Sequence, residues 1–356
     1  MIIVDAHQDI AYNALCFGRD YRRSALATRR LEAGTATPEN AGQATVGFPE
    51  ALLGRVAVTC ATLFVAPHSN RPAPWDALRY TDAREAYRLA SQQLDYYERL
   101  FDEFDRIRPI RTQADLDAVL ATWAEGTEIS EHVQGFVILM ENADPILEPK
   151  QFEEWYDRGV RIVGPAWRGT RYSGGTGEPG PLTDLGRELL AVMQDQNAIL
   201  DLSHMAEEAY FEALDRYEGV VIASHSNPRH FSASDRHLSD AMIRRLAERD
   251  GVMGINCWNP FLNGDWRKGD RKSAVPFSTI IDALDYVCQL TGSAAHVAIG
   301  TDLDGGFGAE SVPEGINTIT DLWKIGDALR DRGFSEADIS AMLADNLLRK
   351  LRAALP

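Results

Sequence analysis

The chain has 356 residues, 45% of them hydrophobic and 25% charged, which is the balance of a globular protein with a buried core and argues against global disorder. Its formal net charge of −17 arises from 36 Lys and Arg against 53 Asp and Glu, and the lack of a basic cluster disfavours nucleic-acid binding. No apolar run reaches the roughly 18 residues that span a bilayer, and the start of the chain lacks the pattern of a secretion signal. We therefore expect a cytoplasmic protein with no membrane partner.

Eight short apolar runs along the chain predict β-strands, because each is followed by a polar or Gly-rich turn. The runs occupy residues 2–7, 56–65, 135–142, 160–167, 198–204, 219–225, 251–258 and 296–302. Segments with helical periodicity lie between them, at residues 76–104, 184–195, 205–216, 239–249, 278–290 and 317–331. Eightfold alternation of strand and helix is typical of an α/β protein with a (β/α)8 barrel of the TIM type.

Three further segments complete this barrel, which we expect to form a single domain over residues 1–356. Residues 18–50, rich in Arg, Gly and Thr, form a loop insertion after the first strand, and residues 168–181 follow the fourth. In a barrel both segments would lie at the carboxyl ends of the strands, where binding loops are found. Ser335 and Asp338 form a capping box at the start of a predicted closing helix over about residues 335–352.

Unusual polar side chains stand at the carboxyl ends of five of the eight predicted strands. They are His7 and Asp9 after the first run, Glu141 after the third, His204 after the fifth, His225 after the sixth and Asp302 after the eighth. These strand ends meet at one rim of a barrel, and residues i and i+2 of a strand point to the same side, so the set predicts a metal site at that rim.

The ligand types indicate which ion this site takes. Imidazole and carboxylate together suit zinc or a similar divalent ion. Three histidines and two carboxylates exceed what one tetrahedral zinc needs, which favours two Zn²⁺ ions bridged by Glu141. Two ions about 3.5–4 Å apart can hold a hydroxide between them and polarise a substrate oxygen, an arrangement suited to hydrolysis. Asp302 would then act as general base and later as general acid.

Each of these residues also has a simpler explanation when it is considered alone. His7 and Asp9 would be a solvated strand end, Glu141 a cap for the following turn, and each later histidine a satisfied core or turn residue. An Asx turn would explain an aspartate after the last strand, although that explanation fits Asp304 better than Asp302. The combination at matched positions favours the metal site.

Seven motifs, in order along the chain, carry a family resemblance. VDAHQDI near the start, DLSH and SHSNPR in the middle, and then SDRHLSD, HVAIGTDLDGG, VPEG and ADNLLRKL together resemble the renal, or membrane, dipeptidases. These are binuclear zinc peptidases of the amidohydrolase superfamily. The resemblance implies that His7 and Asp9 bind one zinc, that His204 and His225 bind the other, and that Glu141 bridges them.

The resemblance has further implications for catalysis and assembly. It implies that Asp302 shuttles a proton and that Arg236, in SDRHLSD, binds the free carboxylate of a dipeptide, a role that suits the forked guanidinium. Homodimers and tolerance of a D-residue at the C-terminal position of the substrate are also implied.

Two positions depart from the family pattern. Where the family usually carries a histidine that polarises the scissile carbonyl, the run GVRIVGPAW gives Trp167, whose indole N–H donates one hydrogen bond but cannot become cationic. Trp258 stands where a tyrosine is expected near the substrate. Arg168 and Arg171 are candidates to replace the histidine, but surface solvation explains both arginines more simply. Packing at the rim explains the two tryptophans equally well.

The leading hypothesis from these residues is a zinc-dependent dipeptidase whose substrate is a small molecule. Because Trp167 and the altered loop after it affect substrate recognition, the first alternative is a related amidohydrolase that acts on a non-peptide amide or on an N-acyl or N-modified amino acid. The second alternative is a catalytically weak binding or regulatory protein, which would have no need of the complete ligand set.

Overall fold

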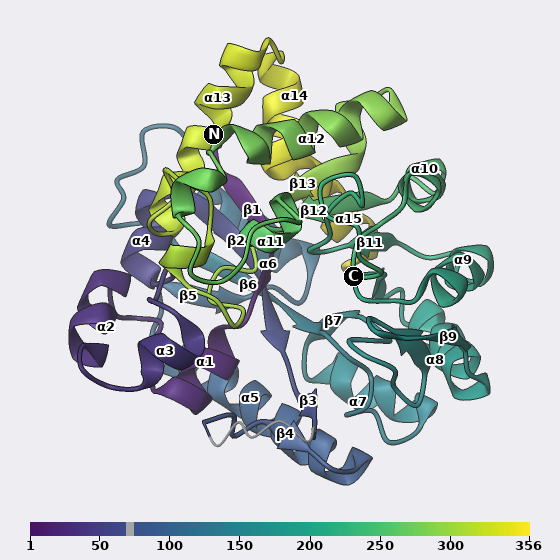
Figure 1. Ribbon diagram of the computed structural model, residues 1–356. Coiled ribbons are helices and arrows are strands. Elements are labelled where there is room, and N and C mark those ends of the chain that lie inside the picture. Colours follow the sequence, from purple (N-terminus) through teal and green to yellow (C-terminus); the bar gives the residue numbers. More distant parts are fainter. Residues whose placement is uncertain (69–74) are drawn as a thin grey trace.

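The computed structural model describes residues 1–68 and 75–356, and a parallel β-barrel stands at its centre (Figure 1). Within the described residues the barrel has eight strands: β1 (Ile3–Gln8), β2 (Val56–Leu63), β6 (Gln134–Met140), β7 (Val160–Val163), β10 (Ile199–Asp201), β11 (Val221–Ala223), β12 (Val252–Ile255) and β13 (Val297–Ile299). The strand order is β2-β1-β13-β12-β11-β10-β7-β6, and pairing of β6 with β2 closes the ring. Each predicted run overlaps one of these strands, so the predicted barrel is confirmed.

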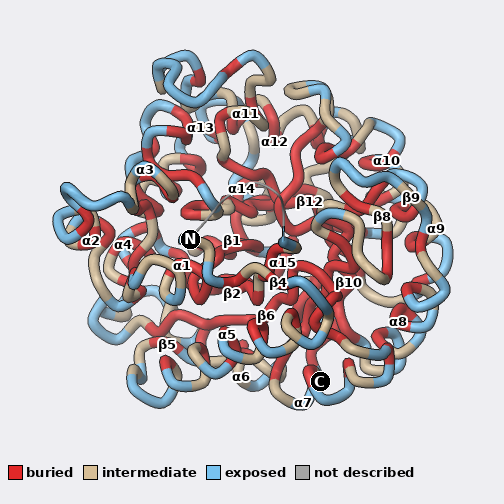
Figure 2. The backbone as a smooth tube through the Cα atoms, turned by 60° about the horizontal axis from the view of Figure 1, so that its bottom comes forward, coloured by how far each residue is buried: buried red, intermediate tan, exposed pale blue. Residues whose placement is uncertain are grey.

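The barrel forms because its strands are buried on both faces, as parallel strands must be. All residues of β1 and β2 are buried, and Figure 2 shows the same for the centre of the molecule, with exposed residues confined to the outer loops and helices. One apolar cluster fills the inside of the barrel and includes Val4, Val137 and Ile222. A larger cluster lies between the barrel and the surrounding helices.

The helices of the described residues surround this barrel. They are α1 (Ile10–Phe17), α2 (Ala25–Glu32), α3 (Thr37–Ala41), α4 (Phe48–Leu53), α5 (Ala83–Glu103), α6 (Gln113–Ala121), α7 (Phe152–Asp157), α8 (Asp184–Asp195), α9 (Glu207–Arg216), α10 (Asp240–Glu248), α11 (Asn259–Leu262), α12 (Ser278–Thr291), α13 (Lys324–Arg332), α14 (Glu336–Ser340) and α15 (Asn346–Ala354). None of them is both long enough and apolar enough to cross a membrane.

Two predicted helices begin later than expected. The helix predicted from residue 76 begins at Ala83, because the Asp82 side chain caps it by accepting the N–H of Glu85, and Arg79–Tyr80 forms the short strand β4 beside β3 (Ala66–Pro67). The helix predicted from residue 317 starts as a 3-10 turn (Ile319–Trp323) and becomes α-helical only in α13.

The C-terminal segment seals the end of the barrel opposite the polar strand ends. Ser335 accepts the N–H of Asp338 and so begins α14, which continues through a π-helical turn (Ala341–Asp345) into α15. Leu347 and Leu351 of α15 belong to the apolar cluster inside the barrel, next to residues at the beginnings of the strands. The opposite rim remains available for binding.

Residues 18–50 are more regular than a loop, because they contain α2, α3 and the start of α4. The buried carboxylate of Asp304, in the loop after β13, holds this segment in place through hydrogen bonds. Its Oδ1 accepts from the N–H and the hydroxyl of Thr45 at 2.7 and 2.6 Å, and its Oδ2 accepts from the N–H of Val46 at 3.2 Å. Buried Arg19 lies 3.6 Å from the same carboxylate and pairs with Glu32.

Asp304→Ala should therefore destabilise the fold by about 3 kcal/mol, because it leaves buried donors of the insertion without an acceptor. Urea unfolding followed by circular dichroism measures this loss. The control Asp20→Ala removes an exposed partner of Arg22, and such pairs contribute less than about 1 kcal/mol. Equal losses in the two variants would contradict the assigned role of Asp304.

Residues 168–181 form a hairpin of β8 (Ser173–Gly175) and β9 (Glu178–Leu182). The hairpin lies against the end of β10, since the N–H of Ala206 donates to the carbonyl of Gly174. A short extra strand, β5 (Ile107–Pro109), pairs with the beginning of β6 outside the ring. The hairpin thus belongs to the rim where the polar strand ends meet.

Candidate metal centre

Glu141 stands at the middle of a buried polar cluster at the carboxyl ends of the strands. Its Oε1 lies 3.2 Å from Nε2 of His204 and 3.5 Å from Nε2 of His225. Its Oε2 lies 3.6 Å from Nε2 of His7. The two oxygens of one carboxylate therefore face two different groups of nitrogen atoms, which is the geometry of a bridging ligand.

The group of Glu141, His204 and His225 has the dimensions of a zinc site. The two Nε2 atoms lie 3.0 Å apart, and both lie within 3.5 Å of Glu141 Oε1. Donor atoms about 2.1 Å from a tetrahedral zinc lie about 3.4 Å from one another. One ion fits among these three atoms after shifts of a few tenths of an ångström.

A second group gathers around His7. Asp9 Oδ1 lies 3.8 Å and Asp302 Oδ1 3.9 Å from His7 Nε2, and the three side chains form a second possible metal-binding set. The hydroxyl of Thr62 donates to Asp9, and Nδ2 of Asn256 donates to Asp302 Oδ2 at 2.8 Å. These hydrogen bonds hold the two carboxylates in place beside the imidazole.

The electrostatics of the cluster couple its histidines and carboxylates closely. Burial lowers the pKa of His7, but the carboxylates of Glu141, Asp9 and Asp302 outweigh this effect and raise it to about 10. Burial alone would raise the pKa of Glu141, yet the surrounding histidines hold it well below its usual range. Burial and the charge of Arg236 lower the pKa of His204 to about 4.

The pKa values of the other two carboxyl groups, Asp9 and Asp302, are raised by burial and by neighbouring negative charges. Burial and the charge of Glu141 raise the pKa of Asp9 to about 6. Burial, with the charges of Asp9 and Glu141, raises the pKa of Asp302 well above its ordinary value. Such a set is stabilised when divalent ions replace the protons, because a metal favours the ionised carboxylates and the neutral imidazoles.

Two further observations fit a metal. His7 Nε2 is buried and has no hydrogen-bond partner, so a donor or an ion is required there. His204 and Asp302 both adopt the left-handed backbone conformation, with φ of 66° and 55°, which is uncommon for residues other than glycine and clusters at functional sites. The residues present therefore fit a metal-binding site.

A cavity of about 560 Å³ opens over this cluster. Arg236 lines it and is only 5% exposed. Its Nη2 donates to the carbonyl of His225 at 2.6 Å and its Nη1 to the hydroxyl of Ser226 at 3.3 Å, whereas its Nε has no hydrogen-bond partner. Among the described residues, no carboxylate forms an ion pair with it. Burial lowers the pKa of Arg236 to about 10, so the side chain remains cationic at neutral pH. A buried cation without a carboxylate is suited to binding an anionic ligand.

Both tryptophans expected near the substrate line the same cavity. Trp167 packs edge-on against Phe64, with ring centroids 5.2 Å apart, and its centroid lies 6.1 Å from that of His204. Trp258 stacks on Phe307 at 5.6 Å. The cavity is therefore lined by two aromatic pairs, Trp167 with Phe64 and Trp258 with Phe307.

The two arginines proposed as substitutes for a histidine differ in position. Arg168 lines the cavity and is exposed, 3.9 Å from Glu178. Arg171 instead donates to the carbonyls of Ile146 and Leu147, which commits its guanidinium to the neighbouring loop. Of the two, only Arg168 is available to a ligand in the cavity.

Several supporting residues were missed by sequence reasoning. Thr176 of the hairpin contacts Nδ1 of His204 at 3.2 Å, Asn256 contacts Asp302, and Asp201 and Ser224 lie behind the histidines. A signal existed for the last two, because Asp201 interrupts an apolar run in DLSH and Ser224 precedes the histidine of SHSNPR. Nothing in the sequence distinguishes Thr176 or Asn256 from other polar loop residues.

A parallel barrel with histidines and carboxylates clustered at its carboxyl rim defines a metal-dependent hydrolase class. The family model described as membrane dipeptidase (Peptidase family M19) matches residues 1–355. The chain therefore belongs to the M19 family and is a metallodipeptidase. The resemblance inferred from the motifs is confirmed.

The chain is also similar to curated proteins over part of its length. An uncharacterized protein in the pqqA 5′ region of Klebsiella pneumoniae is 30% identical over 214 residues, which cover 58% of this chain and 76% of that protein. Dipeptidase aclJ of Aspergillus oryzae is 27% identical over 172 residues, covering 48% of this chain and 39% of that protein.

Two solved structures share the fold. A metallopeptidase from Rhodobacter sphaeroides, liganded with a phosphinate mimic of the dipeptide L-Ala-D-Ala, has a TM-score of 0.77 at 22% identity, with 99% of both chains covered. The probable dipeptidase PvdM from Pseudomonas aeruginosa has a TM-score of 0.79 at 18% identity, covering 99% of this chain and 95% of that one.

Proposed function

We propose that this metallodipeptidase uses two zinc ions and hydrolyses dipeptides, including those with a D-residue at the C-terminal position. One observation carries the proposal. One carboxylate oxygen of Glu141 faces His7, and the other oxygen faces His204 and His225. His7 and Asp9 would hold one ion, the other two histidines the second, and Glu141 both. The L-Ala-D-Ala mimic bound by the Rhodobacter sphaeroides relative supports the stereochemical part.

The residues of the chain have distinct roles in this proposal. Zinc, when bound, supplies an activated water and polarises the scissile carbonyl. Asp302 takes the proton from the attacking water and gives it to the departing amine, a task that suits a carboxyl whose pKa is raised by burial and neighbouring carboxylates. Arg236 binds the free carboxylate of the substrate and so fixes the peptide bond above the cluster.

Metal analysis combined with a substrate panel tests the proposal. Protein purified without chelator should contain two zinc ions per chain and release amino acids from L,L and L,D dipeptides. Two bound metals without dipeptide hydrolysis would reject the dipeptidase activity. Failure to bind zinc, even after reconstitution, would reject the metal centre.

Trp167 favours a second candidate among amide substrates. It occupies the position where the family usually has a histidine, and with Phe64 it forms an apolar wall beside His204. This wall suits an acyl or other apolar group on the amino side of the scissile bond. N-acyl amino acids included in the panel separate this candidate, because they share the free carboxylate but lack the amino group of a dipeptide.

Arg236→Lys tests the carboxylate site. We expect KM for dipeptides to rise about 100-fold with little change in kcat, because a two-pronged charged hydrogen bond becomes a single contact. Steady-state kinetics with a dipeptide and its C-terminal amide measure the effect. The amide, which lacks the carboxylate, should be hydrolysed equally by both proteins.

The matched control for this substitution is Arg229→Lys, on the same loop and paired with Glu207 outside the cavity. It should keep the wild-type KM. A parallel loss of amide hydrolysis in Arg236→Lys would mean that the side chain supports the fold and not the carboxylate.

A further inference from the structure

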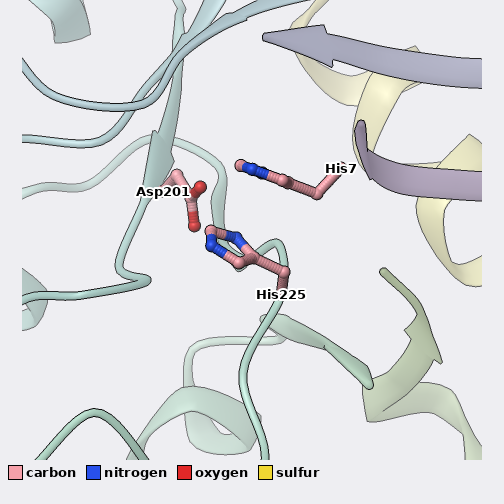
Figure 3. Close-up of side chains that lie close together, drawn as sticks. All are labelled: His7, Asp201 and His225. Atoms are coloured by element: carbon pink, nitrogen blue, oxygen red, sulfur yellow. The ribbon is translucent and has the colours of Figure 1, made fainter. Parts of the chain in front are cut away.

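A buried pair of residues lies behind the metal-facing histidines. Asp201 is the last residue of β10 and Ser224 directly follows β11, and both are at most 1% exposed. Figure 3 shows the Asp201 carboxylate beside the rings of His7 and His225. These two rings stack with centroids 3.6 Å apart. The pair therefore contacts histidines that face the two different sides of Glu141.

The Asp201 carboxylate is fully engaged by hydrogen bonds from the protein. Its Oδ1 accepts the N–H groups of Ser203 and Ser224 at 3.0 and 2.8 Å. Its Oδ2 accepts the hydroxyl of Ser224 at 2.5 Å, a short charge-assisted bond. The direction of this last bond is fixed, because an ionised carboxylate can only accept.

The Ser224 hydroxyl has one proton and two lone pairs. The proton is given to Asp201, so toward any other partner the oxygen acts as an acceptor. His225 Nδ1 lies 2.8 Å and His7 Nδ1 3.4 Å from this oxygen. In their neutral, metal-binding form both rings must therefore carry their hydrogen on Nδ1, which leaves the lone pair on Nε2. In each ring Nε2 is the atom that faces Glu141.

The backbone around Ser224 leaves little freedom for this arrangement to shift. Gly254 on β12 and Gly300 after β13 both lie against the Ser224 carbonyl oxygen. A Cβ at these positions would be 2.0 and 1.8 Å from that oxygen, closer than any side chain permits. The two glycines therefore let the barrel close tightly around Ser224.

We propose that Asp201 and Ser224 are positioning residues that fix the Nε2 tautomers of His7 and His225 and thereby couple the two metal positions. The proposal rests on the two-zinc function above. One hydroxyl serves a histidine of each ion, so disturbing it weakens both ions together. The geometric alternative, in which Asp201, His7 and His225 hold an ion directly, conflicts with the Ser224 hydroxyl, which lies 2.5 Å from Asp201 Oδ2 and 2.8 Å from His225 Nδ1.

Asp201→Asn distinguishes the positioning role from a purely structural one, because it should change the tautomer of a histidine. The asparagine oxygen takes over the two backbone N–H groups, so its NH₂ group replaces Oδ2 and donates to Ser224. The hydroxyl then turns its proton toward His225 Nδ1, which places the ring hydrogen on Nε2, where it blocks zinc. Zinc affinity of the site that contains His225 should fall about 10–100-fold, the usual effect of losing a partner that orients a metal ligand. The His7 site should weaken with it, because it shares Glu141 and its own ring contacts the reoriented hydroxyl.

Ser224→Ala should weaken zinc binding less than Asp201→Asn, because it removes the constraint without imposing the wrong tautomer. Ser203→Ala is the control, because its buried hydroxyl contacts the Ser224 hydroxyl at 3.3 Å and accepts the backbone N–H of His225 at 3.2 Å but contacts no imidazole nitrogen. It should keep the wild-type affinity. Competition with a chromogenic chelator measures both zinc constants on the full-length zinc-loaded protein.

Nitrogen NMR of ¹⁵N-histidine-labelled, zinc-loaded protein reads the tautomers directly, with His7 and His225 assigned by single substitution. Nδ1–H signals for both rings, together with the order of affinities above, support the proposal. Metal coordination through Nδ1, or equal affinities in Asp201→Asn and wild type, would overturn it. Both readouts are independent of turnover, so absence of dipeptide hydrolysis would reject the proposed function without affecting this result.

Discussion

Glu141→Gln should abolish zinc retention and peptidase activity together. A glutamine has one carbonyl oxygen and one NH₂ group, so it can face only one of the two histidine groups as an acceptor, and it removes the negative charge between them. The loss in zinc affinity should exceed the roughly 10–100-fold caused by losing a partner of a ligand. Elemental analysis after dialysis, followed by a dipeptide assay on the same sample, measures both quantities.

Glu148→Gln is the matched control for this experiment, because it makes the same chemical change at an exposed position of the same loop. It should retain two zinc ions and full activity. If Glu141→Gln also kept two tightly bound ions, the bridging role would be wrong, whatever its effect on turnover.

Asp302→Asn should retain both zinc ions and lose about 10²–10⁴-fold in kcat, the range expected when a general acid–base group is removed. Asparagine keeps the size of the side chain but cannot carry the proton. The available space is narrow, since a Cβ on Gly305 would lie 1.9 Å from Asp302 Oδ1. Steady-state kinetics and metal content, measured on the same preparation, distinguish a proton shuttle from a metal ligand.

The alternative role follows from the position of Asp302 beside His7 and Asp9. If Asp302→Asn loses zinc, the carboxylate is a ligand and the proton shuttle must be another group. Undiminished turnover would eliminate both roles. Asp265→Asn, at an exposed position of another loop, controls for the general effect of removing an aspartate charge.

The barrel was predictable because each strand can be recognised from a short stretch of sequence. Each strand is a short apolar run that is buried on both faces, and such runs remain visible in the sequence without knowledge of their partners. The positions of His7, Glu141, His204 and Asp302 followed from the same pattern, since the carboxyl ends of parallel strands share one rim. Their gathering around Glu141 matches that expectation.

Other features depended on tertiary contacts that one sequence does not reveal. The helices of residues 18–50 are short, and the segment is held by Asp304, nearly 260 residues away, in addition to a few buried apolar residues such as Tyr21 and Phe48. Arg171 looked equivalent to Arg168 in sequence, but carbonyls of another loop hold it away from the cavity. Thr176 reaches His204 only because its hairpin folds onto β10.

The span of the metal cluster along the chain also determines when it can form. Its members extend from His7 in the first strand to Asp302 after the last, with Glu141 between them. At synthesis rates of about 5–20 residues per second, roughly 15–60 s separate the appearance of these two ends. The nascent N-terminal half thus carries an incomplete set of ligands throughout translation. Metal capture by the complete cluster is therefore a late event that follows ring closure, and chains interrupted before β13 lack Asp302 of the site.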